Sequence, residues 1–383
     1  MEQRKFVVPE VITGYGSIDL AGRYLKHFGA KKTMVVTDQG VRSQPWFSRI
    51  IASLSAAEIN YTIFDENTPN PKDYEAMLGA ELFLAEECDS LLAVGGGSPI
   101  DCAKCISIVS TNGGHILDYE GVDEIRLPGP PLICIPTTAG TSADVSQFAI
   151  ITDTQMHIKK AIISKKVVPD LALIDTIPLM TMDPYLAACT GMDALTHAIE
   201  AYVSNASSPL TDVHAIKAIE LIINALPNAI TADKTLENVG DMMLGSLHAG
   251  FAFSNASLGA VHALAHSLGG TLDLAHGECN SILLEHIVRF NFEAAEKKYA
   301  DIAKAMGVQI EHKSSHEIKE SLVAAIRQLR EKVGIPDHIT HALSNEALES
   351  MCISALNDPC MVTNPKPMTY EEVKQHYVQL FKE

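Results

Sequence analysis

The first half of the chain alternates short apolar runs with longer stretches of helical character. Four β-rich runs are each followed by a helix-length segment: TMVVT (33–37), NYTIF (60–64), SLLAV (90–94) and PLICI (131–135). Such spacing is typical of parallel strands covered by helices on both faces. The later runs FAIIT, KAIIS and LALID either extend this sheet or form a small antiparallel addition. We therefore expect an α/β N-terminal domain with a mostly parallel sheet.

After Pro178 the strand signals stop and the apolar positions follow a helical period. One stripe precedes Pro227, which we expect to interrupt its helix, and consists of Val213, Ile216, Ile219, Ile223 and Leu226. A second stripe consists of Ile318, Leu322, Ile326, Leu329 and Val333. Its helix is expected to begin at a capping pair, Ser314 and Glu317, and to end before Gly334 and Pro336. The pattern predicts two domains, an α/β domain over 1–180 and an all-helical domain over 181–383.

Composition narrows the class of protein. With 383 residues, 47% hydrophobic and 20% charged, the chain can bury two large cores. Its net charge of -18 repels phosphate backbones, so nucleic acid is not an expected partner. No apolar run is long enough to cross a bilayer, and the start MEQRKFVVPE lacks a signal-peptide stretch, so we expect no membrane association and a cytoplasmic location. Eight scattered cysteines suit buried free thiols, and we expect Cys102 and Cys105 to be packing residues, with a redox or zinc role as the alternative.

Histidines and one carboxylate recur at helical spacing in the second half. GMDALTHAIE sets Asp193 four residues before His197, and VHALAHSLGGTLDLAHG holds His262, His266 and His276. Residues four apart share a helix face, so each segment can direct two polar groups at one point. Imidazole and carboxylate ligands suit Fe(II), Zn(II) or another divalent ion. The alternative is that these are ordinary core or surface residues.

The run SLLAVGGGSPIDCAK predicts a site for a pyrophosphate. A buried-type strand leads into Gly95, Gly96 and Gly97, and Ser98 and Pro99 then open a helix whose exposed amides attract an anion. The run is not the GxGxxG fingerprint, and a structural turn is the alternative.

Two further segments sit at the ends of predicted strands. Asp38 follows TMVVT, where a carboxylate can accept hydrogen bonds from an adenosine ribose and repel a 2'-phosphate, which favours NAD over NADP. Its alternative is a helix N-cap. Thr137 and Thr138 follow PLICIP and offer hydroxyls, with a plain loop as the alternative.

With GGGSPID, PTTAGTS, GMDALTHAIEAY and VHALAHSLGG plus AHG in this order, the chain resembles the iron-containing (group III) alcohol dehydrogenases. The resemblance runs from VITGYGS to NDPCMVTNPKPMT and implies their fold, that of the dehydroquinate synthase-like proteins. It implies that the metal ligands are Asp193, His197, His262 and His276, with His266 beside them as a proton-handling or orienting group.

The resemblance also implies a nucleotide site and a substrate pocket. The nucleotide contacts would be Asp38, Asn70, Gly96, Gly97, Ser98, Thr137, Thr138 and Lys159. Phe253 and Cys360 would line the substrate pocket, although both suit a core equally well. Where many members read AGTGSE, this chain has AGTSAD from Ala139 to Asp144, which puts the loop geometry near the nicotinamide in doubt.

The expected reaction is reversible hydride transfer between NAD and a small primary alcohol or diol, or its aldehyde, in a cleft between the domains. The metal, Fe(II) or else Zn(II), would polarise the substrate oxygen. A homodimer or larger homo-oligomer is expected. The alternatives are a zinc polyol dehydrogenase, an NAD-using lyase, a metal-dependent hydrolase and a catalytically silent binding protein. The sequence leaves the identity of the alcohol open.

Overall fold

The computed structural model describes residues 5–156, 158–341 and 343–381. Its contacts divide the chain into two compact units, Val7–Met182 and a unit that begins at Asp183 and includes the residues before Val7. The ring of Phe6 stacks on the ring of His214 in that second unit, with 5.8 Å between ring centroids. Phe6 therefore packs against the helical part of the chain.

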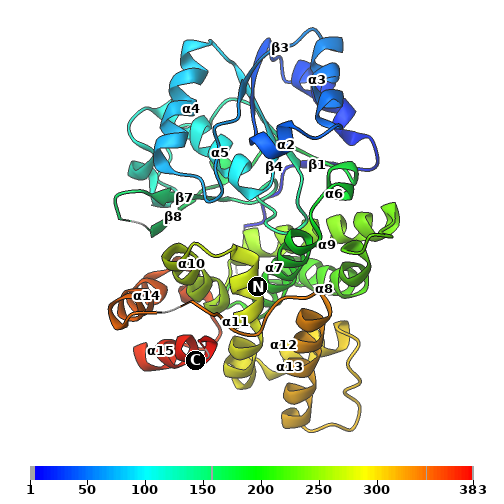
Figure 1. Ribbon diagram of the computed structural model, residues 1–383, viewed down its shortest axis with the longest axis vertical. Helices are drawn as coiled ribbons and strands as arrows, with labels where there is room; N and C mark the ends of the chain where they lie inside the picture. The colour runs from blue at the N-terminus through cyan, green and yellow to red at the C-terminus, as the bar shows by residue number, and fades with distance from the viewer. Residues whose placement is uncertain (1–4, 157, 342, 382–383) are drawn as a thin grey trace. The chain divides into compact units, whose positions relative to one another are not determined.

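A six-stranded parallel sheet forms the centre of the first unit (Figure 1). In spatial order its strands are β1 (Glu10–Thr13), β9 (Leu171–Ile174), β6 (Leu132–Pro136), β4 (Ser90–Gly95), β2 (Lys32–Val36) and β3 (Asn60–Phe64). The strands β4 and β6 are buried along their whole length, as expected for a sheet covered on both faces. The predicted parallel sheet is confirmed.

Helices cover both faces of this sheet. They are α1 (Ala21–His27), α2 (Gln39–Arg42), α3 (Phe47–Ala56), α4 (Asp73–Ala85), α5 (Gly97–Asn112) and α6 (Ile177–Met180). Successive strand side chains point to opposite faces, so Leu91 joins the core under α4 and α5 while Leu92 joins the core under α1 and α3. The thiols of Cys102 and Cys105 are fully buried in the first of these cores, and all eight cysteines of the chain are free. The packing role expected for this pair is confirmed.

The three later β-rich runs divide between two sheets. LALI, in β9, enters the main sheet, while β7 (Phe148–Asp153) and β8 (Ile158–Ile163) pair antiparallel in a second sheet. The short strand β5 (Gly121–Val122) pairs with β8 in parallel and completes that second sheet. Both expected arrangements therefore occur: LALI extends the parallel sheet, and FAIIT and KAIIS form a small antiparallel addition.

The second unit is helical. Its helices are α7 (Pro184–Val203), α8 (Pro209–Ala229), α9 (Leu236–Ala256), α10 (Ala260–Leu272), α11 (His276–Asn291), α12 (Glu296–Ala305), α13 (Ser315–Lys332), α14 (Asn345–Asn357) and α15 (Tyr370–Leu380). From Ala188 to Val203 every residue of α7 is buried, because α8, α9 and α11 pack around it. Beyond its exposed first turn, helix α7 is thus a central helix without a solvent face.

The stripe predicted for α8 is partly wrong. Val213 is 64% exposed, and the buried face instead includes Ala215, Ala218 and Ile222. Small alanines give close contact with α7 and α9, which the apolar period alone does not reveal. Pro227 does not interrupt the helix, which continues to Ala229. Pro227 lies in the last turn, so any distortion it causes affects only the end of the helix.

The stripe predicted for α13 is confirmed. Ser314 and Glu317 form a reciprocal capping box, and Leu322 and Ile326 are fully buried. Gly334 follows the helix in the left-handed region, with φ of 82°. Among the described residues, no helix combines the length and apolar character needed to cross a membrane.

Candidate metal and nucleotide sites

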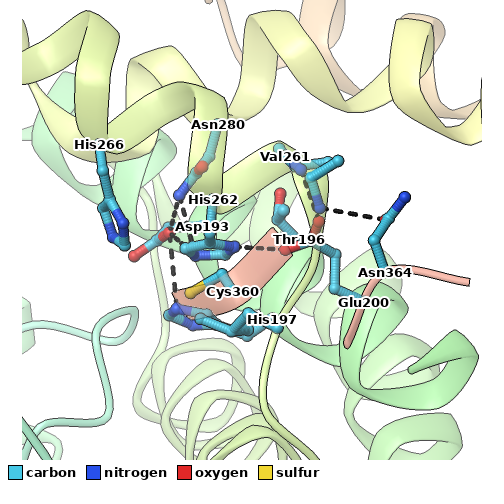
Figure 2. Close-up of polar contacts among 12 residues, drawn as sticks. Asp193, Thr196, His197, Glu200, Val261, His262, His266, Asn280, Cys360 and Asn364 are labelled. Carbon is cyan, nitrogen blue, oxygen red and sulfur yellow. Dashed lines mark hydrogen bonds and ion pairs between the residues drawn. The ribbon is translucent and has the colours of Figure 1, made fainter. Parts of the chain in front are cut away.

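Three helices of the second unit direct polar side chains at one buried point (Figure 2). Asp193 and His197 lie one turn apart on α7, His262 lies in the first turn of α10, and His276 is the first residue of α11. Asp193 Oδ1 is 3.5 Å from His262 Nε2 and 3.8 Å from the Nε2 atoms of both His197 and His276. The ligand atoms of Asp193, His262 and His276 thus lie within 4.8 Å of one another, and His197 approaches the same carboxylate.

Gly277 explains how α11 can begin so close to α7. A Cβ atom at this position would lie 2.2 Å from the carbonyl oxygen of Cys189, so only glycine fits the contact. The contact places His276 beside Asp193, whose own Cβ lies 3.3 Å from the same point.

The amide nitrogen of Asn280 lies where several of the candidate ligand atoms converge. Its Nδ2 lies 2.6 Å from Asp193 Oδ1 and 3.1 Å from the Nε2 atoms of His262 and His276. A carboxamide nitrogen carries two hydrogens and so cannot donate to all three atoms at once. Its Oδ1 is buried without a hydrogen-bond partner among the described residues. A divalent cation satisfies several such lone pairs at once, and one carboxylate with imidazoles suits Fe(II) or Zn(II).

Electrostatics favour the ionised state of the carboxylate at this point. Burial opposes ionisation of Asp193, but His197, His276 and His262 outweigh it and lower the pKa of Asp193. Burial would likewise lower the pKa of His262, but hydrogen bonds to Asp193 and Glu200 raise it to about 9. The carboxylate is thus ready to bind a cation, which would displace the proton from His262.

Phe253 packs against the metal-ligand candidates. The ring of His197 lies between Phe253 and His262, with centroid distances of 4.3 Å and 4.6 Å. Phe253 is itself 4% exposed, and it thus forms one wall beside the predicted ligands.

His266 forms a hydrogen-bonded pair with a carboxylate that sequence reasoning did not single out. Its Nδ1 lies 2.8 Å from Asp358 Oδ2, and its ring stacks on that of His276 at 5.2 Å. Burial raises the pKa of Asp358, but His266 and the backbone N–H of Cys360 outweigh it and lower the pKa to about 2. Burial raises the pKa of the Cys360 thiol, which is therefore neutral at ordinary pH.

Two other groups at the site had weak sequence signals. Asn280 lies four residues after His276, and Glu200 seven after Asp193, so helical spacing alone could have suggested both. Asp358 follows α14 in a loop and had no periodic signal.

Residues predicted to bind the nucleotide lie in the first unit, at the carboxyl ends of neighbouring strands. Asp38 follows β2, Gly96 follows β4 and Thr137 follows β6. The chain leaves β2 for β3 on one side and leaves β4 for β6 on the other, which makes the ends of β2 and β4 a topological switch point. Ligands of open α/β sheets bind at such points.

The glycine run fits tightly against its surroundings. A Cβ at Gly95 would lie 2.5 Å from Pro99, and one at Gly96 would lie 3.2 Å from Thr138. The backbone N–H of Thr137 donates to the carbonyl oxygen of Gly95 at 2.9 Å, so the glycine run and the predicted nucleotide-binding segment at Thr137 are in contact. The hydroxyl of Thr138 is buried without a hydrogen-bond partner among the described residues. The N-cap of α5, Gly96, makes no side-chain capping bond, so the first turn of the helix, which includes Gly97 and Ser98, lacks this kind of cap for its amides.

The other predicted nucleotide contacts have structural roles as well. Asp38 caps α2, because its Oδ1 accepts the N–H of Val41 at 2.8 Å. Asn70 has a φ of 56°, and its carbonyl oxygen accepts from Lys72 Nζ. Lys159 lies on β8 and lowers the pKa of Asp101, which burial nevertheless raises to about 6.

The loop that departs from the common family pattern is buried. Ser142 is 3% exposed and has a φ of 49°, where many members carry glycine. Burial raises the pKa of Asp144 to about 6. The substitutions are therefore packed inside the first unit.

Comparison with known proteins gives the family. Residues 9–176 match the iron-containing alcohol dehydrogenase family, and residues 187–381 match the C-terminal domain of the Fe-containing alcohol dehydrogenase family. The chain is 38% identical to 1,3-propanediol dehydrogenase of Citrobacter freundii, covering 98% of each chain. It is 35% identical to NAD-dependent methanol dehydrogenase of Bacillus methanolicus, covering 97% of each chain. A crystal structure of 1,3-propanediol oxidoreductase superposes with a TM-score of 0.95 and 37% identity, covering 99% of this chain and 100% of the other.

The fold and the cluster of Asp193, His262 and His276 fit an enzyme with a candidate metal site in one unit and a sheet of the nucleotide-binding type in the other. More particularly, the chain belongs to the iron-containing alcohol dehydrogenase family. It is an NAD-dependent alcohol dehydrogenase that interconverts small alcohols and aldehydes, and iron is the metal for which the family is named.

Proposed function

We propose that the protein oxidises a small primary alcohol or diol, and reduces its aldehyde, at a metal held by Asp193, His197, His262 and His276. The observation that carries this proposal is the convergence of Asp193, His262 and His276 on Asn280 Nδ2. The cation, when bound, supplies the positive charge that polarises the substrate oxygen. The named relatives act on 1,3-propanediol and methanol, which supports short alcohols as the substrate class.

We propose roles in substrate binding and proton transfer for residues beside the metal-ligand candidates. We assign the acceptance of the alcohol proton to His266, and two contacts support this role: its Nδ1 lies 2.8 Å from Asp358 Oδ2, and its ring stacks on that of His276. Phe253 and Cys360 are proposed as walls of the substrate pocket, and the neutral Cys360 thiol adds no charge there. A short apolar substrate suits such a wall, since a charged one would leave its charge unpaired.

The nucleotide contacts are proposed at the switch point of the sheet. Gly96, Gly97 and Ser98 would bind the pyrophosphate through the first amides of α5, and Asp38 the ribose. We include Thr137 and Thr138 among the nucleotide contacts because both lie against the glycine run. We include Lys159 because it lies close enough to Asp101, in the helix that follows the glycine run, to lower the pKa of that carboxyl. Asn70 completes the set. We accordingly assign nucleotide binding to 1–180 and metal binding to 181–383.

We also propose a homodimer or larger homo-oligomer and a cytoplasmic location. Among the described residues, β1 is an edge strand with no neighbouring strand on one side, which supports pairing between copies. Eight buried free thiols suit a reducing compartment. Size-exclusion chromatography with light scattering tests the first proposal, and a strictly monomeric mass would contradict it.

The function is tested by NADH formation with ethanol and 1,3-propanediol on anaerobic protein loaded with Fe(II). His262→Ala should lose the metal and at least about a hundredfold in kcat/KM, because a metal site missing one ligand supplies little Lewis acidity. Metal content is measured in parallel by mass spectrometry. Full activity in this variant would contradict the proposed site.

A further inference from the structure

Glu200 makes two short hydrogen bonds to the start of α10 (Figure 2). Its Oε2 lies 2.5 Å from His262 Nδ1, and its Oε1 accepts the backbone N–H of Val261 at 2.7 Å. The side chains of Glu200 and His262 are only 4% and 1% exposed. Such bonds to a buried carboxylate are strong because water does not compete for either partner.

The imidazole of His262 is thereby held between two carboxylates of one helix. Glu200 lies seven residues after Asp193 on α7, so the two side chains share a face two turns apart. Glu200 meets the Nδ1 side of the ring, and Asp193 Oδ1 lies 3.5 Å from Nε2. If the Nδ1 hydrogen is donated to Glu200, Nε2 is the nitrogen whose lone pair is left for a cation.

The backbone around His262 is fixed from a second direction. The N–H of Ala260 donates to Asn364 Oδ1 at 3.1 Å, and Asn364 forms reciprocal bonds of 2.8 Å and 2.9 Å with Asn291. A Cβ at Gly259 would lie 2.9 Å from both Glu200 Oε1 and Asn364 Oδ1. Side chains from other elements therefore satisfy the first amides of α10, and the tight fit leaves Glu200 little room to move.

We propose that Glu200 is a positioning residue that fixes the Nδ1–H form of His262, directs Nε2 toward the metal and thereby sets metal affinity. The inference rests on the proposed metal site. Carboxylates that hold a metal-bound histidine in this way typically contribute about 10- to 100-fold in affinity.

The experiment compares Co(II) and Zn(II) affinity, by chelator competition, between the parent and Glu200→Gln. The glutamine oxygen must still accept from Val261, so its NH₂ group faces His262 and can only donate to Nδ1. The ring hydrogen then moves to Nε2 and blocks the lone pair needed by the metal. We expect affinity to fall about 10- to 100-fold. Affinity equal to that of the parent would overturn the proposal.

Tyr377→Phe is the matched control. Tyr377 Oη donates to the carbonyl oxygen of Leu264 at 2.9 Å, so this variant removes a buried bond to the same helix without reaching His262. Its metal affinity should remain that of the parent. An equal loss in both variants would mean that loosening α10 explains the effect, and would overturn the specific role of Glu200.

His262→Ala separates this inference from the metal site itself. If His262→Ala binds metal like the parent, the proposed site is wrong. If His262→Ala loses binding while Glu200→Gln does not, only the role of Glu200 fails.

A measurement on the unaltered sequence covers the case in which Glu200→Gln does not fold. Zn(II)-loaded protein labelled with ¹⁵N-histidine should show His262 with a slowly exchanging, strongly downfield hydrogen on Nδ1 and none on Nε2. The signal is assigned by its loss in His262→Ala. A hydrogen on Nε2 instead of Nδ1 would overturn the proposal.

Discussion

His266 Nδ1 and Asp358 Oδ2 lie 2.8 Å apart, and this bond joins α10 to the loop after α14. It leaves Nε2 as the nitrogen of His266 that can exchange a proton with substrate. Asp358 is therefore the group that orients the proposed proton acceptor.

Asp358→Asn should lower kcat by about 10- to 100-fold, since an amide can donate to Nδ1 and favour the wrong ring form. The metal content should remain that of the parent, because Asp358 belongs to a different group of side chains from Asp193. Steady-state kinetics with a short alcohol and metal analysis measure the two effects. An unchanged kcat would count against an oriented proton acceptor at His266.

Cofactor preference should respond to the charge of Asp38. Because Asp38 also caps α2, serine is the sharper replacement: it keeps an N-cap oxygen and removes the carboxylate. Loss of repulsion toward a 2'-phosphate should raise kcat/KM for NADP relative to NAD by about tenfold or more. Initial rates with both nucleotides give the ratio. The same ratio in Asp38→Ser and the parent would exclude Asp38 from the ribose contact.

Gly277 and Gly270 provide a matched pair of glycine-to-alanine changes. At Gly277 the new methyl group would meet the Cys189 carbonyl oxygen at 2.2 Å, whereas at Gly270 it would meet nothing within 4 Å. Gly277→Ala should destabilise the protein by about 1–3 kcal/mol or more and weaken metal binding as α11 shifts. Gly270→Ala should stabilise it by roughly 0.5–1 kcal/mol through helix propensity. Thermal unfolding of both variants tests the contrast, and equal Tm shifts would contradict it.

The buried carboxyl of Asp144 predicts a pH dependence. Burial raises its pKa from 3.8 to about 6, so the folded state binds this proton more tightly than the unfolded state. Its contribution to stability is fully present below pH 4 and is lost as the pH rises through 6. The shift corresponds to at most about 3 kcal/mol.

Asp144→Asn removes this titration. Relative to the parent, the variant should gain stability between pH 4 and pH 7, as measured by denaturant unfolding at both values. A difference between variant and parent that does not change with pH would show that Asp144 is ionised throughout in the folded protein.

The local sequence was sufficient to predict many of the helices and strands and part of the candidate metal site. Alternating runs gave the parallel strands, and the capping box of Ser314 and Glu317 marked the start of α13. The i,i+4 spacing of Asp193 and His197 identified one segment of candidate ligands, since helix geometry alone places them on one face. The family resemblance supplied the remaining candidate ligands.

Contacts between segments distant in sequence decided what the patterns could not. The buried face of α8 follows alanines because α7 and α9 approach closely there, and a hydrophobic period does not encode that distance. Asp358 meets His266, and Glu200 meets His262, only after separate helices pack. A sequence by itself determines which faces and turns its helices and strands present, because these depend on near neighbours. The partner of each buried polar group is decided by tertiary packing, because only there do elements far apart along the chain come within hydrogen-bonding distance.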